Sequence, residues 1–229
     1  MNLNNLQALD GAKESRPAPG AALDHLTVAA LTLEQGVEHV RRCLGVVVPP
    51  GGKHPLMGTH NCLMRLGAGL FLEIIAPDPS ATPQRTRWFA LDDPAMRARL
   101  AETPQLIGWV VRVPDLKTAL QGQDQSAGEA VPLTRGSLSW LISVPADGSM
   151  AFGGAFPTLI EWPDGPHPAE GMADLGCRFE HLAIAHPDSR GLTRTLGPLF
   201  RDDRVSISGG ANVRLRATIK IPDGIRELT

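Results

Sequence analysis

Alternating apolar and polar residues predict strands along much of this chain, while helical spacing marks only short segments. Residues 23–30 alternate as a strand. Residues 33–44 then place apolar side chains on one helical face, between Thr32 and Gly45, which suit the two ends of a helix. The rest of this first unit is predicted as a short strand, a Pro/Gly-rich loop and the two strands of a hairpin, at 46–48, 49–55, 60–66 and 70–76.

The same order of elements recurs twice further along the chain, as an internal repeat does. The middle copy is predicted as a strand, a helix and three strands, at 106–113, 114–121, 129–134, 138–144 and 158–162. The C-terminal copy begins at Arg178 and has a predicted helix and three strands, near 189–200, 204–208, 212–221 and 224–228. Each copy is therefore a βαβββ module of about fifty residues.

The outer two modules begin with strands that are near copies of each other. Each has a His at its third position: LDHLTVA at 23–29 contains His25, and FEHLAIA at 179–185 contains His181. The last strand of each module carries a lone glutamate, which is Glu73, Glu161 or Glu227. A carboxylate in so apolar a strand is costly to bury without a partner, so the repeated His and Glu raise the question of a metal site. In the middle module, however, Gly108 stands at the His position.

These modules divide the 229 residues into six segments. They are a flexible lead-in at 1–21, a first module at 22–76, a connector at 77–105, a second module at 106–163, a linker at 164–177 and a third module, complete or partial, at 178–229. The connector is rich in proline and then helical from about Asp93 to Ala101.

Composition excludes several classes of function. The net charge of −2 and the lack of a Lys/Arg-rich run argue against a nucleic-acid partner or an anionic membrane. No apolar run is long enough to span a membrane, and the first 20 residues lack the apolar stretch of a secretory signal. Three widely spaced cysteines suit reduced thiols. We therefore expect a cytoplasmic protein.

The modules resemble the vicinal oxygen chelate superfamily, which includes glyoxalases and extradiol dioxygenases. The first module resembles its glyoxalase-like domain family in four segments, LDH at 23–25, GGKHP at 51–55, GTHN at 58–61 and LEI at 72–74. The resemblance implies an α+β fold in which paired βαβββ modules form open, cup-shaped mixed sheets with helices outside. It also implies that first-strand His and last-strand Glu residues hold a divalent metal, namely zinc, nickel, manganese or iron.

In this family a substrate oxygen binds the metal, which acts as a Lewis acid. The resemblance thus implies a lyase, isomerase or dioxygenase that acts on a small oxygenated molecule, and we expect a homodimer. The candidate metal ligands are His25, Glu73, His60 and His181. Either Glu73 or Glu161, if left unligated, is the candidate general base.

Which modules pair is left open by the sequence. If the first and second modules form the cup, they offer His25, Glu73 and Glu161. If the first and third modules form the cup, they offer His25, Glu73, His181 and Glu227. A dimer could also supply a missing half.

The candidate substrate-binding residues are His54, His60, Asn61 and Arg65. His54 lies in the predicted loop, and Arg65 could bind a carboxylate if it points into the cup. A two-residue hairpin turn would place His60 on the face of Glu73, whereas a three-residue turn would place Asn61 and Arg65 there. We favour the first register.

Two other functions remain open. A metal-free cup that binds a small molecule would keep the His and Glu as hydrogen-bonded residues, and a structural dimerisation module would bind no ligand. No nucleophile elbow or phosphate loop occurs in the sequence, so hydrolase chemistry of that type and nucleotide binding have no support.

Overall fold

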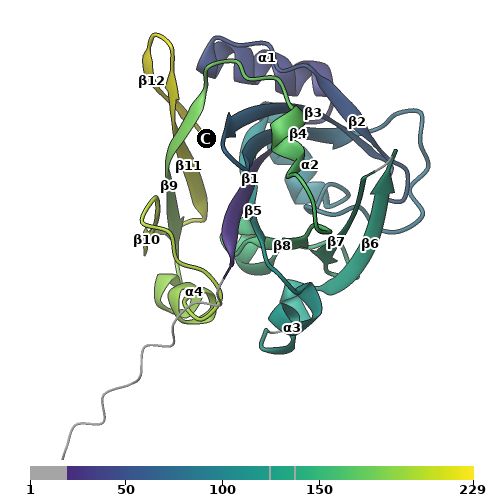
Figure 1. The fold of residues 1–229 in the computed structure, drawn as a ribbon, viewed down its shortest axis with the longest axis vertical. Helices are drawn as coiled ribbons and strands as arrows, with labels where there is room; N and C mark the ends of the chain where they lie inside the picture. The colour runs from purple at the N-terminus through teal and green to yellow at the C-terminus, as the bar shows by residue number, and fades with distance from the viewer. Residues whose placement is uncertain (1–19, 124, 137) are drawn as a thin grey trace, which may run out of the picture.

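The computed structural model describes residues 20–229 except 124 and 137, so nearly all of the predicted lead-in at 1–21 lies outside the described residues. The described chain forms an eight-stranded sheet that curls into a cup and a separate four-stranded sheet beside it (Figure 1). The helices at 33–44 and 116–121 lie outside the curled sheet (Figure 1), whereas the helix at 94–102 packs Met96 and Leu100 into the apolar cluster inside the cup. Among the described residues, no helix is long and apolar enough to cross a membrane.

Two halves with the same connectivity build the eight-stranded sheet, in the order β2-β3-β4-β1-β5-β8-β7-β6. The first half comprises β1 (Ala22–Ala29), α1 (Leu33–Leu44), β2 (Pro50–His54), β3 (Thr59–Gly67) and β4 (Leu70–Pro77). The second comprises β5 (Gln105–Arg112), α3 (Leu116–Gln121), β6 (Glu129–Arg135), β7 (Leu138–Val144) and β8 (Thr158–Glu161). In each half the first strand pairs in parallel with the last, and β1 joins β5 antiparallel in the middle. The first and second modules therefore form the cup together.

The C-terminal segment follows the predicted chain order but not the predicted repeat of the sheet. Its elements are β9 (Arg178–His186), α4 (Ser189–Leu196), β10 (Val205–Gly209), β11 (Arg214–Ile221) and β12 (Gly224–Leu228). The sheet order is β10-β9-β11-β12, so the first strand of this unit lies inside its sheet and pairs with β10 and β11 rather than with the last strand. Apolar packing joins this sheet to the cup, as where Trp109 of β5 contacts Phe200 edge-on.

Two expectations for the first module are wrong. Residues 46–48 are not a strand, and the predicted loop at 49–55 instead contains β2, an edge strand of the sheet. Proline is tolerated at the start of an edge strand, where Pro50 lies. Gly52 fits because it has no side chain: a Cβ there would lie 2.5 Å from Cδ of Arg135. Glycine in this strand thus allows close approach of a neighbour.

The helix over 33–44 is confirmed together with its ends. Thr32 accepts a hydrogen bond from the backbone N–H of Gln35, and Gly45 ends the helix in the left-handed region at φ 75°. The connector contains the predicted helix as α2 (Pro94–Glu102). Before α2, the connector places Trp88 and Phe89 among the buried side chains of the cup interior.

The two edge strands of the cup face each other across a gap in the hydrogen-bonded sheet. Strands β2 and β6 are the ends of the strand order, and they contact each other without forming a ladder in the described part of the chain. Figure 1 shows the sheet curled so that these two strands approach. We call this junction the seam of the cup; Gly52 lies on one side of it and Arg135 on the other.

Candidate functional site

A β-bulge positions the central histidine of the cup. On β5, Val111 pairs with Leu23 and Val110 pairs with His25, so Asp24 is an extra residue on β1. Bulges of this kind redirect side chains and are frequent beside functional sites. Here the Asp24 carboxylate reaches its own neighbour: Oδ1 lies 2.7 Å from Nδ1 of His25.

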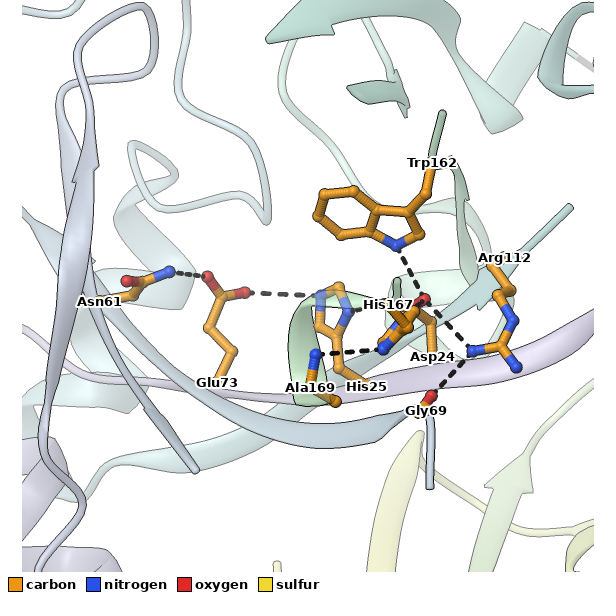
Figure 2. Close-up of polar contacts among 9 residues, drawn as sticks. All are labelled: Asp24, His25, Asn61, Gly69, Glu73, Arg112, Trp162, His167 and Ala169. Atoms are coloured by element: carbon orange, nitrogen blue, oxygen red, sulfur yellow. Dashed lines mark hydrogen bonds and ion pairs between the residues drawn. The ribbon is translucent and has the colours of Figure 1, made fainter. Parts of the chain in front are cut away.

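Asp24 is a buried anion with several donors around it. Its Oδ2 accepts hydrogen bonds from Nε1 of Trp162 at 3.0 Å and from Nε2 of His167 at 2.8 Å, and Nη1 of Arg112 lies 4.0 Å away (Figure 2). Burial opposes the charge, but the hydrogen bonds from His167 and His25 outweigh it and lower the pKa of Asp24 to about 2. Asp24 is therefore ionised at neutral pH.

This carboxylate sets the orientation of the His25 ring. An ionised Asp24 can only accept, so Nδ1 of His25 carries a proton and donates it. In the neutral imidazole, Nε2 then bears a free lone pair. That atom points at Oε2 of Glu73, 3.6 Å away, and both side chains are buried (Figure 2). The ring itself stacks on Phe71, with centroids 4.4 Å apart.

Asn61 holds the other end of Glu73. Its Nδ2 donates to Oε1 of Glu73 at 2.7 Å, and its Oδ1 accepts from the backbone N–H of Gly52 at 2.8 Å and from Nη1 of Arg135 at 3.3 Å. The amide orientation is fixed by these partners, because its oxygen faces two donors and its nitrogen faces a carboxylate. Glu73 therefore presents Oε2 toward His25 in a defined geometry.

His54 is a buried, neutral histidine at the edge of the site. Burial is the main cause that lowers the pKa of His54 to about 4, with Glu73 opposing and Arg135 adding to the shift. Its Nδ1 lies 3.1 Å from Oγ1 of Thr59, and Nδ2 of Asn61 lies 3.5 Å from its Nε2. Both ring nitrogens are thus engaged, which leaves His54 as a packing and orienting group.

A small cavity of about 30 Å³ lies beside these groups. It is lined by His25, His54, Asn61, Leu63, Phe71, Glu73, Trp88, Phe89, Arg135, Trp140, Ile142, Ile160 and Trp162. Three of the four tryptophans of the chain take part, together with the four buried polar groups His25, His54, Asn61 and Glu73 and the half-buried cation Arg135. This is the usual composition of a small-molecule site, an apolar enclosure with a few convergent polar groups.

Asn61, not His60, shares the face of Glu73. Leu63 pairs with Glu73, so the register that we favoured is wrong and the alternative with a longer turn is observed. His60 lies on the opposite face of β3, near Glu34 of α1, and does not line the cavity. Arg65 is on the face of Asn61 but beyond the cavity, where its Nε donates to the carbonyl of Gly67. Of the four predicted substrate-binding residues, the structure places His54 and Asn61 at the cavity.

The remaining predicted groups lie elsewhere. Glu161 points away from the cup, and its Oε2 accepts a hydrogen bond from the backbone N–H of Leu116 at the start of α3. His181 belongs to the separate sheet, and Glu227 is an exposed residue of β12 whose Oε1 lies 3.5 Å from Arg216. Of the predicted ligands and bases, the structure brings together His25 and Glu73.

The strand register identifies what stands opposite these two residues in the second half. His25 pairs with Val110 and Thr27 with Gly108, so β1 and β5 are related symmetrically and Gly108 corresponds to His25. Thr27 pairs with Glu73, and Val110 correspondingly pairs with Thr158. Thr158 thus occupies the place of Glu73, and the second half has neither imidazole nor carboxylate there.

These residues do not fit the divalent metal that the resemblance implies. Among the described residues, no group of three or more His, Cys, Asp or Glu side chains could hold a metal ion. His25 and Glu73 offer two donors, one Glu73 oxygen is occupied by Asn61, and the corresponding positions of the second half offer Gly108 and Thr158. Zinc sites in proteins use three or four protein ligands. The donor set supports chemistry by the side chains themselves.

Several site residues were missed by the sequence reasoning. Asp24 stands inside the LDH segment at 23–25, yet the strand pattern alone gives it no role, because only a bulge turns it toward His25. Arg135 and the tryptophans come from the second half and the connector, where no repeat marked them. His167 lies in the Pro/Gly-rich linker and reaches Asp24 only through tertiary structure.

Comparisons with known proteins agree with this architecture. The model of a family described as "Glyoxalase-like domain" matches residues 23–200. A hypothetical protein from Staphylococcus aureus has a crystal structure with 12% sequence identity and a TM-score of 0.57, covering 91% of this chain and 98% of that one. No curated protein matches the sequence.

More distant structural neighbours include methylmalonyl-CoA epimerases. The enzyme from Mycobacterium tuberculosis is 18% identical, with a TM-score of 0.39 over 65% of this chain and 91% of its own. That from Streptomyces coelicolor, in complex with 2-nitronate-propionyl-CoA, is also 18% identical, with a TM-score of 0.38 over 64% and 98%. At these TM-scores the likeness supports no conclusion about this chain.

Proposed function

The chain belongs to the glyoxalase-like domain family, and we propose that it is a metal-independent acid–base enzyme of the isomerase or lyase class. Its substrate is a small oxygenated molecule with an acidic C–H bond next to a carbonyl group. The observation that carries this proposal is the Asp24–His25 pair, which turns Nε2 of His25 toward Glu73, 3.6 Å away, at the wall of the cavity.

In the proposed reaction, Nε2 of His25 takes the proton from the substrate carbon. The electron pair of the broken C–H bond moves onto the carbonyl oxygen and gives an enolate. Asp24 and Glu73, both buried, stabilise the imidazolium that forms, because each lies on one side of the ring. The proton held on Nε2 exchanges with solvent, and Nε2 then delivers a proton to a neighbouring atom of the substrate, so the step needs no other reactant and carries deuterium from D2O into the substrate.

Both groups lie on one wall of the cavity, since β1 and β4 are adjacent strands. A substrate is therefore approached from one side, which favours proton transfer between neighbouring atoms on the same face over inversion of one centre. The aromatic side chains that line the rest of the cavity exclude water and strengthen electrostatic interactions there.

Solvent deuterium provides the test. The protein would be incubated in D2O with small 2-oxo acids and 2-hydroxy ketones, and deuterium incorporation next to the carbonyl would be followed by proton NMR. We expect His25→Gln to slow the exchange by about 10²–10⁴-fold, the usual contribution of a general base. His60→Gln is the matched control, because His60 is a strand histidine outside the cavity, and it should exchange at the wild-type rate.

Two results would contradict the proposal. One is exchange that chelators abolish and that metal restores, with about one metal ion bound per chain, since that would require a metal centre. The other is wild-type protein that exchanges none of these compounds, which would favour the metal-free binding cup as the function.

A further inference from the structure

We infer that Arg135 is the substrate-anchoring residue, and that the substrate is a small carboxylate; this rests on the proposed function. A continuous row of polar side chains crosses the cup. Asp24, His25, Glu73, Asn61 and Arg135 follow one another at separations of 2.7, 3.6, 2.7 and 3.3 Å. The acid–base pair stands at one end of this row and a guanidinium at the other.

The position of Arg135 suits an anion-binding group. It is the last residue of β6, half-buried, and it lines the cavity beside the seam between β2 and β6. Its guanidinium carbon lies 6.0 Å from the ring centroid of Trp140, so the aromatic face holds the cation beside the cavity. Burial lowers the pKa of Arg135, with Glu73 opposing the shift, yet an arginine stays charged at any ordinary pH.

The guanidinium of Arg135 has more N–H donors than its hydrogen bond to Asn61 requires. Nη1 of Arg135 donates to Oδ1 of Asn61 at 3.3 Å, which is long for a charged donor, and a guanidinium has five N–H groups. The remaining donors suit a carboxylate, which accepts two parallel hydrogen bonds from arginine. Trp88 also lines the cavity, and its Nε1 is a buried donor without a hydrogen-bond partner among the described residues.

The charges then fix how the substrate lies. The carboxylate of a substrate would be repelled by Glu73 and Asp24 and attracted by Arg135. This orientation places the acidic C–H bond of the substrate toward His25. The cavity of about 30 Å³ holds few atoms in this conformation. Since β2 and β6 share no ladder in the described chain, the flexible arginine can move at the seam to admit a small acid without breaking the sheet.

Gly52 supplies the space for this arginine. A Cβ at Gly52 would lie 2.5 Å from Cδ and 3.1 Å from Nε of Arg135. Gly52→Ala should therefore displace the guanidinium without removing its charge. This gives a second way to perturb the anchor, from the opposite side of the seam.

The test measures binding, so it does not depend on turnover. Three tryptophans line the cavity, and their fluorescence would be followed during titration with pyruvate and with its neutral amide, pyruvamide. We expect the wild type to bind pyruvate at least about tenfold more tightly, which a charged hydrogen bond can provide. Arg135→Met should abolish this preference, Arg135→Lys should keep part of it, and Gly52→Ala should reduce it severalfold.

Arg65→Met is the matched control, since Arg65 is a half-buried strand arginine beyond the cavity, and it should bind like the wild type. Circular dichroism would show that each variant is folded. Equal binding of pyruvate and pyruvamide by the wild type, no binding of pyruvate at the highest usable concentration, or a preference retained in Arg135→Met would overturn the assignment. Carboxylate binding without deuterium exchange would instead keep the anchor and reject the proposed function.

Discussion

The two halves of the cup share a topology but differ in chemistry. The first half places His25 and Glu73 on its inner face, supported by Asp24 and Asn61. At the positions that correspond to His25 and Glu73, the second half has Gly108 and Thr158. It contributes instead an aromatic and aliphatic wall and one cation, Arg135. Symmetry of the scaffold therefore does not imply symmetry of the site: one half provides a buried imidazole and carboxylates, and the other provides aromatic enclosure and a cation.

The largest predicted difference between the halves concerns activity. We expect Glu73→Leu to lower the rate of proton exchange by about 10²–10⁴-fold, because the imidazolium at His25 loses a buried counter-charge. Thr158→Leu changes the corresponding residue of the second half and should leave the rate within about threefold of wild type. Equal losses in both variants, measured by the NMR assay, would mean that the two halves share the chemistry.

The second prediction concerns how the free energy of unfolding depends on pH. Burial depresses the pKa of His54 to about 4 in the folded protein, so the unfolded chain binds its proton first as the pH falls. His54 therefore destabilises the fold as pH drops from about 6.5 to about 4, by about 3 kcal/mol in total. In His54→Gln this part of the pH dependence should vanish in urea unfolding at several pH values.

His60→Gln is the control for His54, because it removes a histidine from the other face of the sheet. A pH slope that is identical in wild type and His54→Gln would show that His54 is not held neutral by burial.

The asymmetry can also be tested by restoring the missing groups. An ideal Cβ at Gly108 meets no heavy atom within 4 Å among the described residues, so a larger side chain can enter there. We expect Gly108→His with Thr158→Glu to complete a four-residue site with His25 and Glu73. Zinc at 100 times its dissociation constant should then stabilise the variant by about 2.7 kcal/mol, measured by thermal unfolding.

The wild type is the control for this variant and should gain no such stabilisation. Equal zinc stabilisation of both proteins would contradict the view that two donors are insufficient. No gain in a folded variant would contradict the assigned correspondence between the halves.

The smallest effect should come from Asp24 in acid. Its pKa is lowered to about 2, so its contribution to stability is present above about pH 4 and is lost as pH falls toward about 2. Asp24→Asn should remove about 2 kcal/mol of this acid-dependent stability. Asp174→Asn is the control: Asp174 is exposed and paired with Arg178, so solvent screening should make its effect smaller. Similar effects in both variants would show that burial of Asp24 adds nothing.

Much of the fold was predictable because periodicity and turn residues are local signals. The helix over 33–44 was found with both of its caps, and the strands at 60–66 and 138–144 were placed to within a residue or two. The edge strand β2 was not, since the same glycines that suggest a loop also permit close packing against Arg135. The third repeat predicted a third copy of the same sheet. Its strands do follow the same order along the chain, but they pair in a different order in the sheet.

The site was predictable only in part. His25 and Glu73 stood out because a charged or polar residue in an apolar strand is unusual. Glu161 stood out for the same reason, yet it faces outward as a partner of α3. The choice between His60 and Asn61 depended on one residue of hairpin register, which the sequence left open.

The amino-acid sequence was enough to identify the βαβββ units of the cup, the family and the His25–Glu73 pair, because these depend on the order and spacing of side chains along the chain. Tertiary structure alone decided which modules form the cup, that Asp24 orients His25, and that Arg135 and three tryptophans close the cavity. The physical reason is that strand pairing, a bulge and a seam bring together residues that are distant in sequence, and no local pattern records those contacts.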